Sequence, residues 1–155
     1  MKIYEIMQRN IHSVSPSSSI KETINLMKKE NLGFVVISED KLPVGVITDR
    51  DLLMVIGKEI NMDTPIEKVM KKYVIFVNQN DDISDASDIM GYLQVRRLVV
   101  VNDFGHLVGI ISVADLVRNV YTEEYGYEAI TEISYDFSTP NDTTDKLLQI
   151  SAYKI

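Results

Sequence analysis

The chain has 155 residues, of which 45% are hydrophobic and 25% charged, and it contains neither cysteine nor tryptophan. This size suits one ordinary domain, or two small units that share a core. The lack of cysteine excludes disulfides, zinc ribbons, iron–sulfur centres and thiol catalysis. A net charge of −7 argues against binding of duplex nucleic acid. No apolar run approaches the ~20 residues that cross a bilayer. The first ten residues lack the apolar stretch of a signal peptide, so we expect a cytoplasmic protein without membrane insertion.

Two parts of the chain repeat one another. Residues 6–37 align with residues 69–100 at a spacing of 63 positions, and residues 45–53 align with residues 109–117 at a spacing of 64. An internal repeat of this kind predicts two copies of one structural unit. Because a unit of about 60 residues buries too little surface to be stable alone, the two copies are expected to pack together.

Each copy is predicted, in chain order, as strand, helix, strand, strand and helix. A capping box, Ser19-x-x-Glu22, begins the first helix, and Asp82-x-x-Asp85 stands at the equivalent place in the second copy. The continuous apolar runs are typical of strands covered on both faces. The predicted strands are 11–14, 34–37 and 44–47 in the first copy and 74–77, 98–101 and 107–111 in the second, and the closing helices are 49–56 and 113–121.

This tandem unit, in which both copies close on Gly-h-h-[Ser/Thr]-x-x-Asp (h, apolar), resembles the cystathionine-β-synthase (CBS) domain pair, or Bateman module. The resemblance covers residues 6–121 and rests on Met7 and Met70, on residues 13–16 and 96–99, and on the closing motifs 45–51 and 109–115. It implies a mixed α/β (α+β) fold in which two β-α-β-β-α repeats, residues 1–60 and 61–121, pack with pseudo-twofold symmetry. It also implies a regulatory module that binds AMP, ADP or ATP between the repeats and signals to an effector protein.

The resemblance further implies which residues contact the ligand. The Asp of each closing motif should accept hydrogen bonds from the ribose hydroxyls, and the Ser or Thr should lie near ribose and phosphate. A helix N-terminus with free N–H groups independently favours an anion there, and a carboxylate can accept two hydrogen bonds from a vicinal diol. Gly45 and Gly109 permit close approach to the backbone.

Each site is expected to combine residues of both repeats, and the first site is expected to be the stronger, because Phe76 can stack on adenine and arginines can bind phosphate. The first site comprises Thr48 and Asp51 with Val74, Phe76 and Val77, and with Arg96 and Arg97 nearest the phosphates. The second site comprises Ser112 and Asp115 with Ile11, Ser13 and Val14, and with Phe34 at the place of the arginines.

Several alternatives stay open at this point. The Thr48–Asp51 and Ser112–Asp115 pairs can be plain helix caps. The module can bind S-adenosylmethionine, or it can be an oligomerisation or interaction protein that has no ligand. No catalytic motif is present, so neither an enzyme nor a cofactor or metal site is expected. A homodimer is expected from the resemblance, with apolar side chains on the closing helices supplied by Met54, Ile56, Leu116 and Val120.

Residues 122–155 lie outside the resemblance and form an acidic, tyrosine-rich C-terminal extension. Seven acidic residues against two lysines give this extension a net charge of −5. Apolar and polar residues alternate over 127–137, which is typical of a half-buried strand. An isolated hairpin is marginally stable in water, so the extension is expected to dock on the module or on another chain, or to stay disordered.

Overall fold

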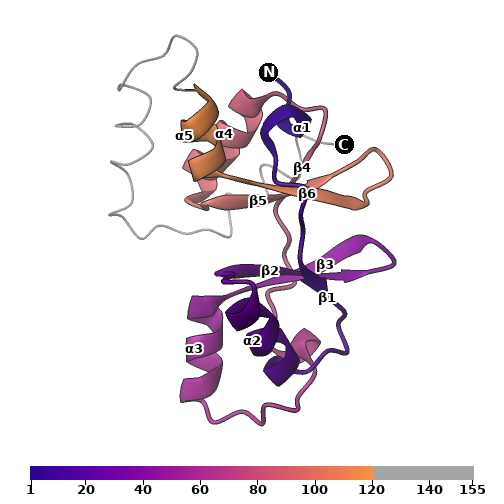
Figure 1. Ribbon diagram of the computed structural model, residues 1–155, viewed down its shortest axis with the longest axis vertical. Coiled ribbons are helices and arrows are strands. Elements are labelled where there is room, and N and C mark those ends of the chain that lie inside the picture. The colour runs from indigo at the N-terminus through magenta and orange to yellow at the C-terminus, as the bar shows by residue number, and fades with distance from the viewer. Residues whose placement is uncertain (121–155) are drawn as a thin grey trace.

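Two three-stranded sheets face each other in the middle of the molecule, and the longer helices cover their outer faces (Figure 1). The computed structural model describes residues 1–120. The first half contains β1 (Ser13–Val14), α2 (Ile20–Lys29), β2 (Phe34–Glu39), β3 (Leu42–Thr48) and α3 (Asp49–Gly57). The second half contains β4 (Phe76–Asn78), α4 (Ile83–Leu93), β5 (Arg97–Val101), β6 (Leu107–Ser112) and α5 (Val113–Val120). The predicted mixed class and the order of elements in each repeat are confirmed.

The strands pair in the same way in both sheets. The middle strand, β2 or β5, runs parallel to the first strand and antiparallel to the third, with one register shift in each antiparallel pair. The β2–β3 hairpin turns at Asp40 and Lys41, whose φ angles of 49° and 68° are both positive, as a type I′ turn requires. The two hairpins touch at this end, because the N–H of Leu107 donates to the carbonyl of Lys41 at 2.8 Å.

Two short helical segments, one before β1 and one before β4, were not expected from the sequence. They are α1 (Ile3–Ile6) and the 3₁₀ helix η1 (Ile66–Lys68). The strands that follow them, β1 and β4, are shorter than the predicted runs 11–14 and 74–77. Both lie at a sheet edge, where only one neighbouring strand supplies hydrogen-bond partners.

The segments that precede β1 and β4 are exchanged between the two halves. The N-terminal segment, residues 1–8, packs on the second half, where Ile3 is fully buried against the core that contains Val77 and Leu98. The connecting segment, residues 58–71, packs on the first half, where Ile66 is fully buried. Figure 1 shows the chain passing from α1 in one half to β1 in the other. Each core therefore contains residues of both parts of the chain.

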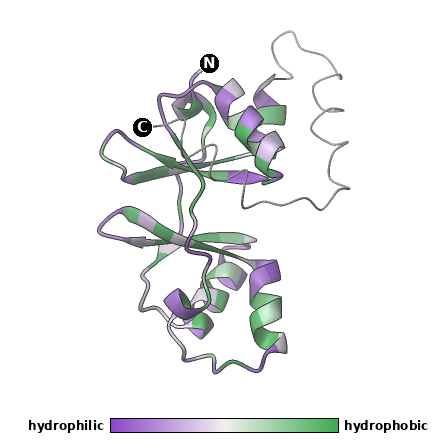
Figure 2. Ribbon diagram, turned by 180° about the vertical axis from the view of Figure 1, so that it is seen from behind, coloured by the Kyte–Doolittle hydropathy of each residue, from purple (hydrophilic) through white to green (hydrophobic). Residues whose placement is uncertain are grey.

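The strands bury apolar side chains on both faces, as their continuous apolar sequence predicts. In β2, Val35 and Ile37 join the helix-covered core, whereas Val36 lies between the sheets. Figure 2 shows this concentration of hydrophobic residues along the strands. The cluster between the sheets is formed by Val36, Val99 and Val101, with Phe34, Val46, Val74, Leu107 and Ile110 packed against it.

The repeated glycines and methionines are explained by the exchange. A Cβ atom at Gly45 would collide with the side chain of Met70, and one at Gly109 would collide with the side chain of Met7. The close approach that these glycines permit is therefore made by methionines of the exchanged segments. Met7 and Met70 are partly buried against the cores, where the flexible methionine side chain fills the space that the glycines leave.

Within residues 1–120, no helix has the length and apolar character that a bilayer span needs. The predicted strand over 127–137, the predicted helix end at Tyr121 and the C-terminal extension lie outside the described residues.

Candidate functional site

The two closing motifs lie where β3 runs into α3 and where β6 runs into α5, on the same side of the molecule (Figure 1). At the first, the N–H and the hydroxyl of Thr48 donate to Asp51 Oδ2 at 3.0 and 2.8 Å. The N–H of Asp51 donates back to Thr48 Oγ1 at 3.2 Å. These bonds form a capping box that fixes the Asp51 carboxylate at the N-terminus of α3.

The second motif has the same local geometry. The N–H of Ser112 donates to Asp115 Oδ2 at 2.9 Å, the Ser112 hydroxyl donates to the same oxygen, and the N–H of Asp115 donates to Ser112 Oγ at 3.3 Å. Both motifs thus cap their helices, as the plainest of the alternatives predicts. In each motif the cap contacts only Oδ2, and the other carboxylate oxygen is directed to a different part of the chain.

That other oxygen is contacted by an exchanged segment. Lys71 Nζ lies 3.0 Å from Asp51 Oδ1, and Gln8 Nε2 donates to both Oδ1 and Oδ2 of Asp115 at 3.0 Å. Neither Lys71 nor Gln8 was predicted as a site residue. The signal available in the sequence was their common place immediately after the repeated Met7 and Met70.

The two carboxylates differ in accessibility. The Asp51 side chain is 20% exposed, whereas that of Asp115 is 2% exposed. Asp115 Oδ1 also lies 3.8 Å from Arg118 Nη1, in addition to its contact with Gln8. A ligand can therefore reach Asp51 more easily than Asp115.

The surroundings of Asp51 favour its charged form. Burial acts to raise its pKa, but the hydrogen bonds from Thr48 and the ion pair with Lys71 outweigh burial and hold the pKa below the ordinary value of 3.8. At neutral pH the N-terminus of α3 thus carries an ionised carboxylate that can accept hydrogen bonds from hydroxyl groups.

This lowered pKa predicts a specific loss of stability in acid. Because the folded protein holds the pKa of Asp51 below its unfolded value, the stabilisation is fully present above the unfolded pKa and is lost as the pH falls through the folded pKa, below 3.8. The free energy of unfolding, measured with urea between about pH 5 and about pH 3, should fall less in Asp51→Asn than in the wild type. Equal losses in the two proteins would contradict the prediction.

The register of the sheets places Phe34 and the arginine pair, which hold equivalent positions in the two repeats. Phe34 is the Cα partner of Thr48 in β2–β3, and Arg97 is the Cα partner of Ser112 in β5–β6. The carbonyl of Arg96 accepts a hydrogen bond from the N–H of Val113 at 3.0 Å. The backbone of the arginine pair therefore adjoins the second motif. That their side chains serve phosphates at Thr48 and Asp51 stays a prediction.

The residues expected around adenine divide into accessible and buried ones. Phe76 and Ser13 are exposed, and Ile11 is half-buried, whereas Val74 and Phe34 pack against the cluster between the sheets. Val14 packs against the first core. Alternation along β4 turns the Val77 side chain into the second core and leaves Phe76 outside, and a contact of Val77 with a ligand stays a prediction.

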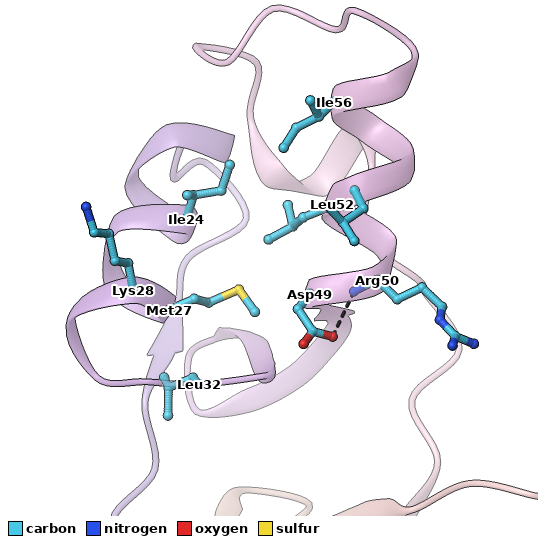
Figure 3. Close-up of a pocket in the computed structure, with 9 residues that line it drawn as sticks. Ile24, Met27, Lys28, Leu32, Asp49, Arg50, Leu52 and Ile56 are labelled. Atoms are coloured by element: carbon cyan, nitrogen blue, oxygen red, sulfur yellow. Dashed lines mark hydrogen bonds between the residues drawn. The ribbon is translucent and has the colours of Figure 1, made fainter.

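A separate groove of about 550 Å³ lies between α2 and α3 on the outer face of the first half (Figure 3). Its apolar lining comes from Ile24, Met27 and Leu32 on one side and Leu52, Leu53 and Ile56 on the other. In Figure 3 the charged ends of Lys28 and Arg50 point away from this groove, and the N–H of Arg50 donates to Asp49 Oδ1 at 2.8 Å. The groove therefore lies next to the first motif but is mainly apolar.

Comparisons with known proteins agree with this architecture. The sequence matches the CBS domain family twice, over residues 3–58 and 66–122. It is 34% identical, over 86% of the chain and 95% of the relative, to the CBS domain-containing protein YhcV of Bacillus subtilis.

Two solved structures are similar to this fold. The first is the CBS domain protein PAE2072 from Pyrobaculum aerophilum complexed with AMP, with a TM-score of 0.70, 26% identity and coverage of 79% of this chain and 100% of that chain. The second is CBSX2 in complex with AMP, with a TM-score of 0.69, 25% identity and coverage of 78% and 96%. With two family matches that fall on two similarly folded and interlocked halves, the chain belongs to the CBS domain family as a tandem pair.

Proposed function

We propose that this CBS pair is a regulatory module that binds an adenine nucleotide at the N-terminus of α3. The observation that carries the proposal is the ionised, partly exposed Asp51 carboxylate, fixed by Thr48 at a helix N-terminus. The similarity to two CBS proteins solved with AMP supports an adenosine ligand.

The proposal assigns a group of the chain to each part of a nucleotide. Asp51 accepts the ribose hydroxyls, and the hydroxyl of Thr48, at the positive end of the α3 dipole, lies near the phosphate. The free N–H groups expected there are absent from the first turn of α3, because the N–H groups of Asp49, Arg50 and Asp51 all donate within the chain. The exposed ring of Phe76 can stack on adenine. Because the chain has a net charge of −7, local cations such as Arg96 and Arg97 are needed to attract an anionic ligand.

A thermal-shift experiment with AMP, ADP, ATP and S-adenosylmethionine tests the proposal. A ligand that binds only the folded state stabilises it by about 2.7 kcal/mol at a hundredfold excess over Kd. AMP, ADP or ATP should therefore raise the melting temperature by several degrees. A larger shift with S-adenosylmethionine would support that ligand instead, and no shift with any of the four would favour an interaction protein without a ligand.

The exposed apolar face of α3 favours a second function in self-association. Leu53, Met54 and Ile56 are all more than half exposed on this helix beside the α2–α3 groove. Of the side chains expected at a dimer interface, Met54 and Ile56 are thus available, whereas Leu116 is buried in the second core. Leu116 is unavailable because its position on α5 faces β6 and α1 rather than solvent. The side chain of Val120 lies outside the described ones.

We therefore predict a homodimer formed through α3. Leu53→Glu places a charge at the centre of the exposed apolar face and should convert a dimer into a monomer, as measured by sedimentation at tens of micromolar, a concentration that populates any stable complex. Leu42→Glu, at the exposed hairpin end, makes the same chemical change elsewhere and should leave the dimer intact. A wild-type monomer, or equal dissociation of both variants, would refute this interface.

The proposal includes a regulatory role without catalysis. It also includes a cytoplasmic location and an effector protein as partner. Its physical basis is that the described site offers a carboxylate that can accept hydrogen bonds from hydroxyls, together with a helix N-terminus and a lysine that favour an anion.

A further inference from the structure

Lys71 occupies at the first motif the place that Gln8 occupies at the second. The N–H and the carbonyl of Lys71 both pair with Val46 of β3 at 2.9 Å. Gln8 pairs in the same way with Ile110 of β6, at 2.8 and 3.0 Å. From these equivalent backbone positions, both side chains reach the aspartate of the nearby closing motif. The chain therefore presents a cation to Asp51 and a neutral amide to Asp115.

The contact between Lys71 and Asp51 involves the oxygen that a ribose would need. Oδ2 of Asp51 already accepts two hydrogen bonds from Thr48, so Oδ1 is the better acceptor for an incoming hydroxyl. Lys71 Nζ forms an ion pair with this Oδ1 at a distance of 3.0 Å. Of the about four acceptor sites of a carboxylate, Thr48 occupies two and Lys71 one, so a vicinal diol that donates two hydrogen bonds has to compete with the lysine ammonium.

Lys71 is able to leave without disturbing the fold. Its side chain is 63% exposed, and its place on β3 is fixed by backbone hydrogen bonds that do not involve the ammonium. An exposed ion pair contributes little to stability. The flexible side chain of lysine can direct its charge to a new partner while the backbone stays paired.

We propose that Lys71 is an exchangeable counter-ion that determines the preference of the first site for phosphorylated adenosine. The ribose hydroxyls displace Lys71 from Asp51, and the released ammonium then pairs with the ligand's phosphate. This inference rests on the proposed function, since it needs adenosine to bind at Asp51. An uncharged adenosine has to displace the same lysine but offers no phosphate in return.

The second motif has a neutral side chain at the place of Lys71, so it lacks the cation that would pair with a ligand's phosphate. Gln8 is neutral and donates to both oxygens of Asp115, whose side chain is 2% exposed. Its displacement would release an amide, which brings no charge to a phosphate. A glutamine at position 71 therefore copies the second motif into the first.

The experiment compares AMP with adenosine by isothermal titration calorimetry in the wild type, Lys71→Gln, Lys71→Arg and Lys72→Gln. Lys71→Gln should weaken AMP binding about tenfold, the scale of one hydrogen bond to a charged group, and leave adenosine binding equal or tighter. Lys71→Arg keeps the charge and should retain most of the AMP affinity. Lys72→Gln removes the same charge from the neighbouring exposed residue and should change AMP affinity less than about threefold. Melting temperatures verify that every variant is folded.

The outcomes separate this inference from the proposed function. If the wild type binds neither AMP nor adenosine, the proposed function fails and the exchange fails with it. If the wild type binds AMP but Lys71→Gln weakens AMP and adenosine equally, Lys71 only supports the structure and the exchange alone is refuted. An unchanged AMP affinity in Lys71→Gln, or an equal loss in Lys72→Gln, refutes it as well.

Discussion

Deletion of residues 58–155 should leave a fragment that does not unfold cooperatively. The fragment keeps all strands and helices of the first half but loses the fully buried Ile66 and the partly buried residues Ile60, Met62, Val69 and Met70 of the connecting segment. It also exposes the face of β2 that contains Val36, because the opposite sheet is gone. A repeat of about 60 residues has too small a core to tolerate both losses. Urea denaturation followed by circular dichroism measures the result, and a sharp two-state transition would contradict it.

Two alanine substitutions in the full chain provide the control for this deletion. Ile66→Ala removes a fully buried side chain and should lower the free energy of unfolding by about 2–5 kcal/mol. Leu42→Ala removes as many carbon atoms from a side chain that is 45% exposed and lies away from α3, so its cost should be much smaller. Equal costs would mean that the connecting segment does not contribute to the first core.

Asp51→Ala should weaken nucleotide binding more than Asp115→Ala does. The Asp51 carboxylate is ten times more exposed than that of Asp115, at 20% against 2%. Hydrogen bonds to a charged group contribute roughly 1.5–3 kcal/mol, so loss of the ribose contact should cost about ten- to a hundredfold in affinity for AMP. Calorimetry with AMP on both variants measures the difference.

Asp49→Ala is the matched control, since it removes the same charge from the same helix at an exposed position. It should leave the affinity for AMP nearly unchanged. If Asp115→Ala alone abolishes binding, the ligand occupies the second site and our assignment is reversed. If neither Asp51 nor Asp115 matters, the closing motifs are helix caps only.

Much of the fold could be predicted because the relevant signals are local. Hydrophobic periodicity, the Ser19 capping box and the apolar runs each depend on residues close in sequence, and the repeat supplied every signal twice. The short helices α1 and η1 carry too few residues for a periodic pattern. Their exchange between the halves is set by packing of Ile3 and Ile66 across long sequence separations, which no local pattern encodes.

The site could be predicted only in part, for the same reason. Thr48 and Asp51 belong to one local motif and could be predicted. Lys71 reaches Asp51 because its backbone pairs with Val46, and no local sequence pattern predicts that pairing. The sequence also did not show that the Val77 side chain faces the second core, because the face of a strand on which a side chain lies changes with each residue. The position of Arg97 opposite Ser112 follows from the antiparallel register of β5 and β6.

The exchange of the two segments sets a constraint on folding during synthesis. Residues 1–8 leave the ribosome before both halves, yet the core that buries Ile3 also contains Leu116 of α5, the last helix that the structure describes. The first half likewise cannot close its core before Ile66 has emerged. Domains generally fold as units, N-terminal parts first, as they are made. Here the N-terminal segment has to wait for α5, so the exposed Ile3 and the open first sheet depend on rapid synthesis of the second half.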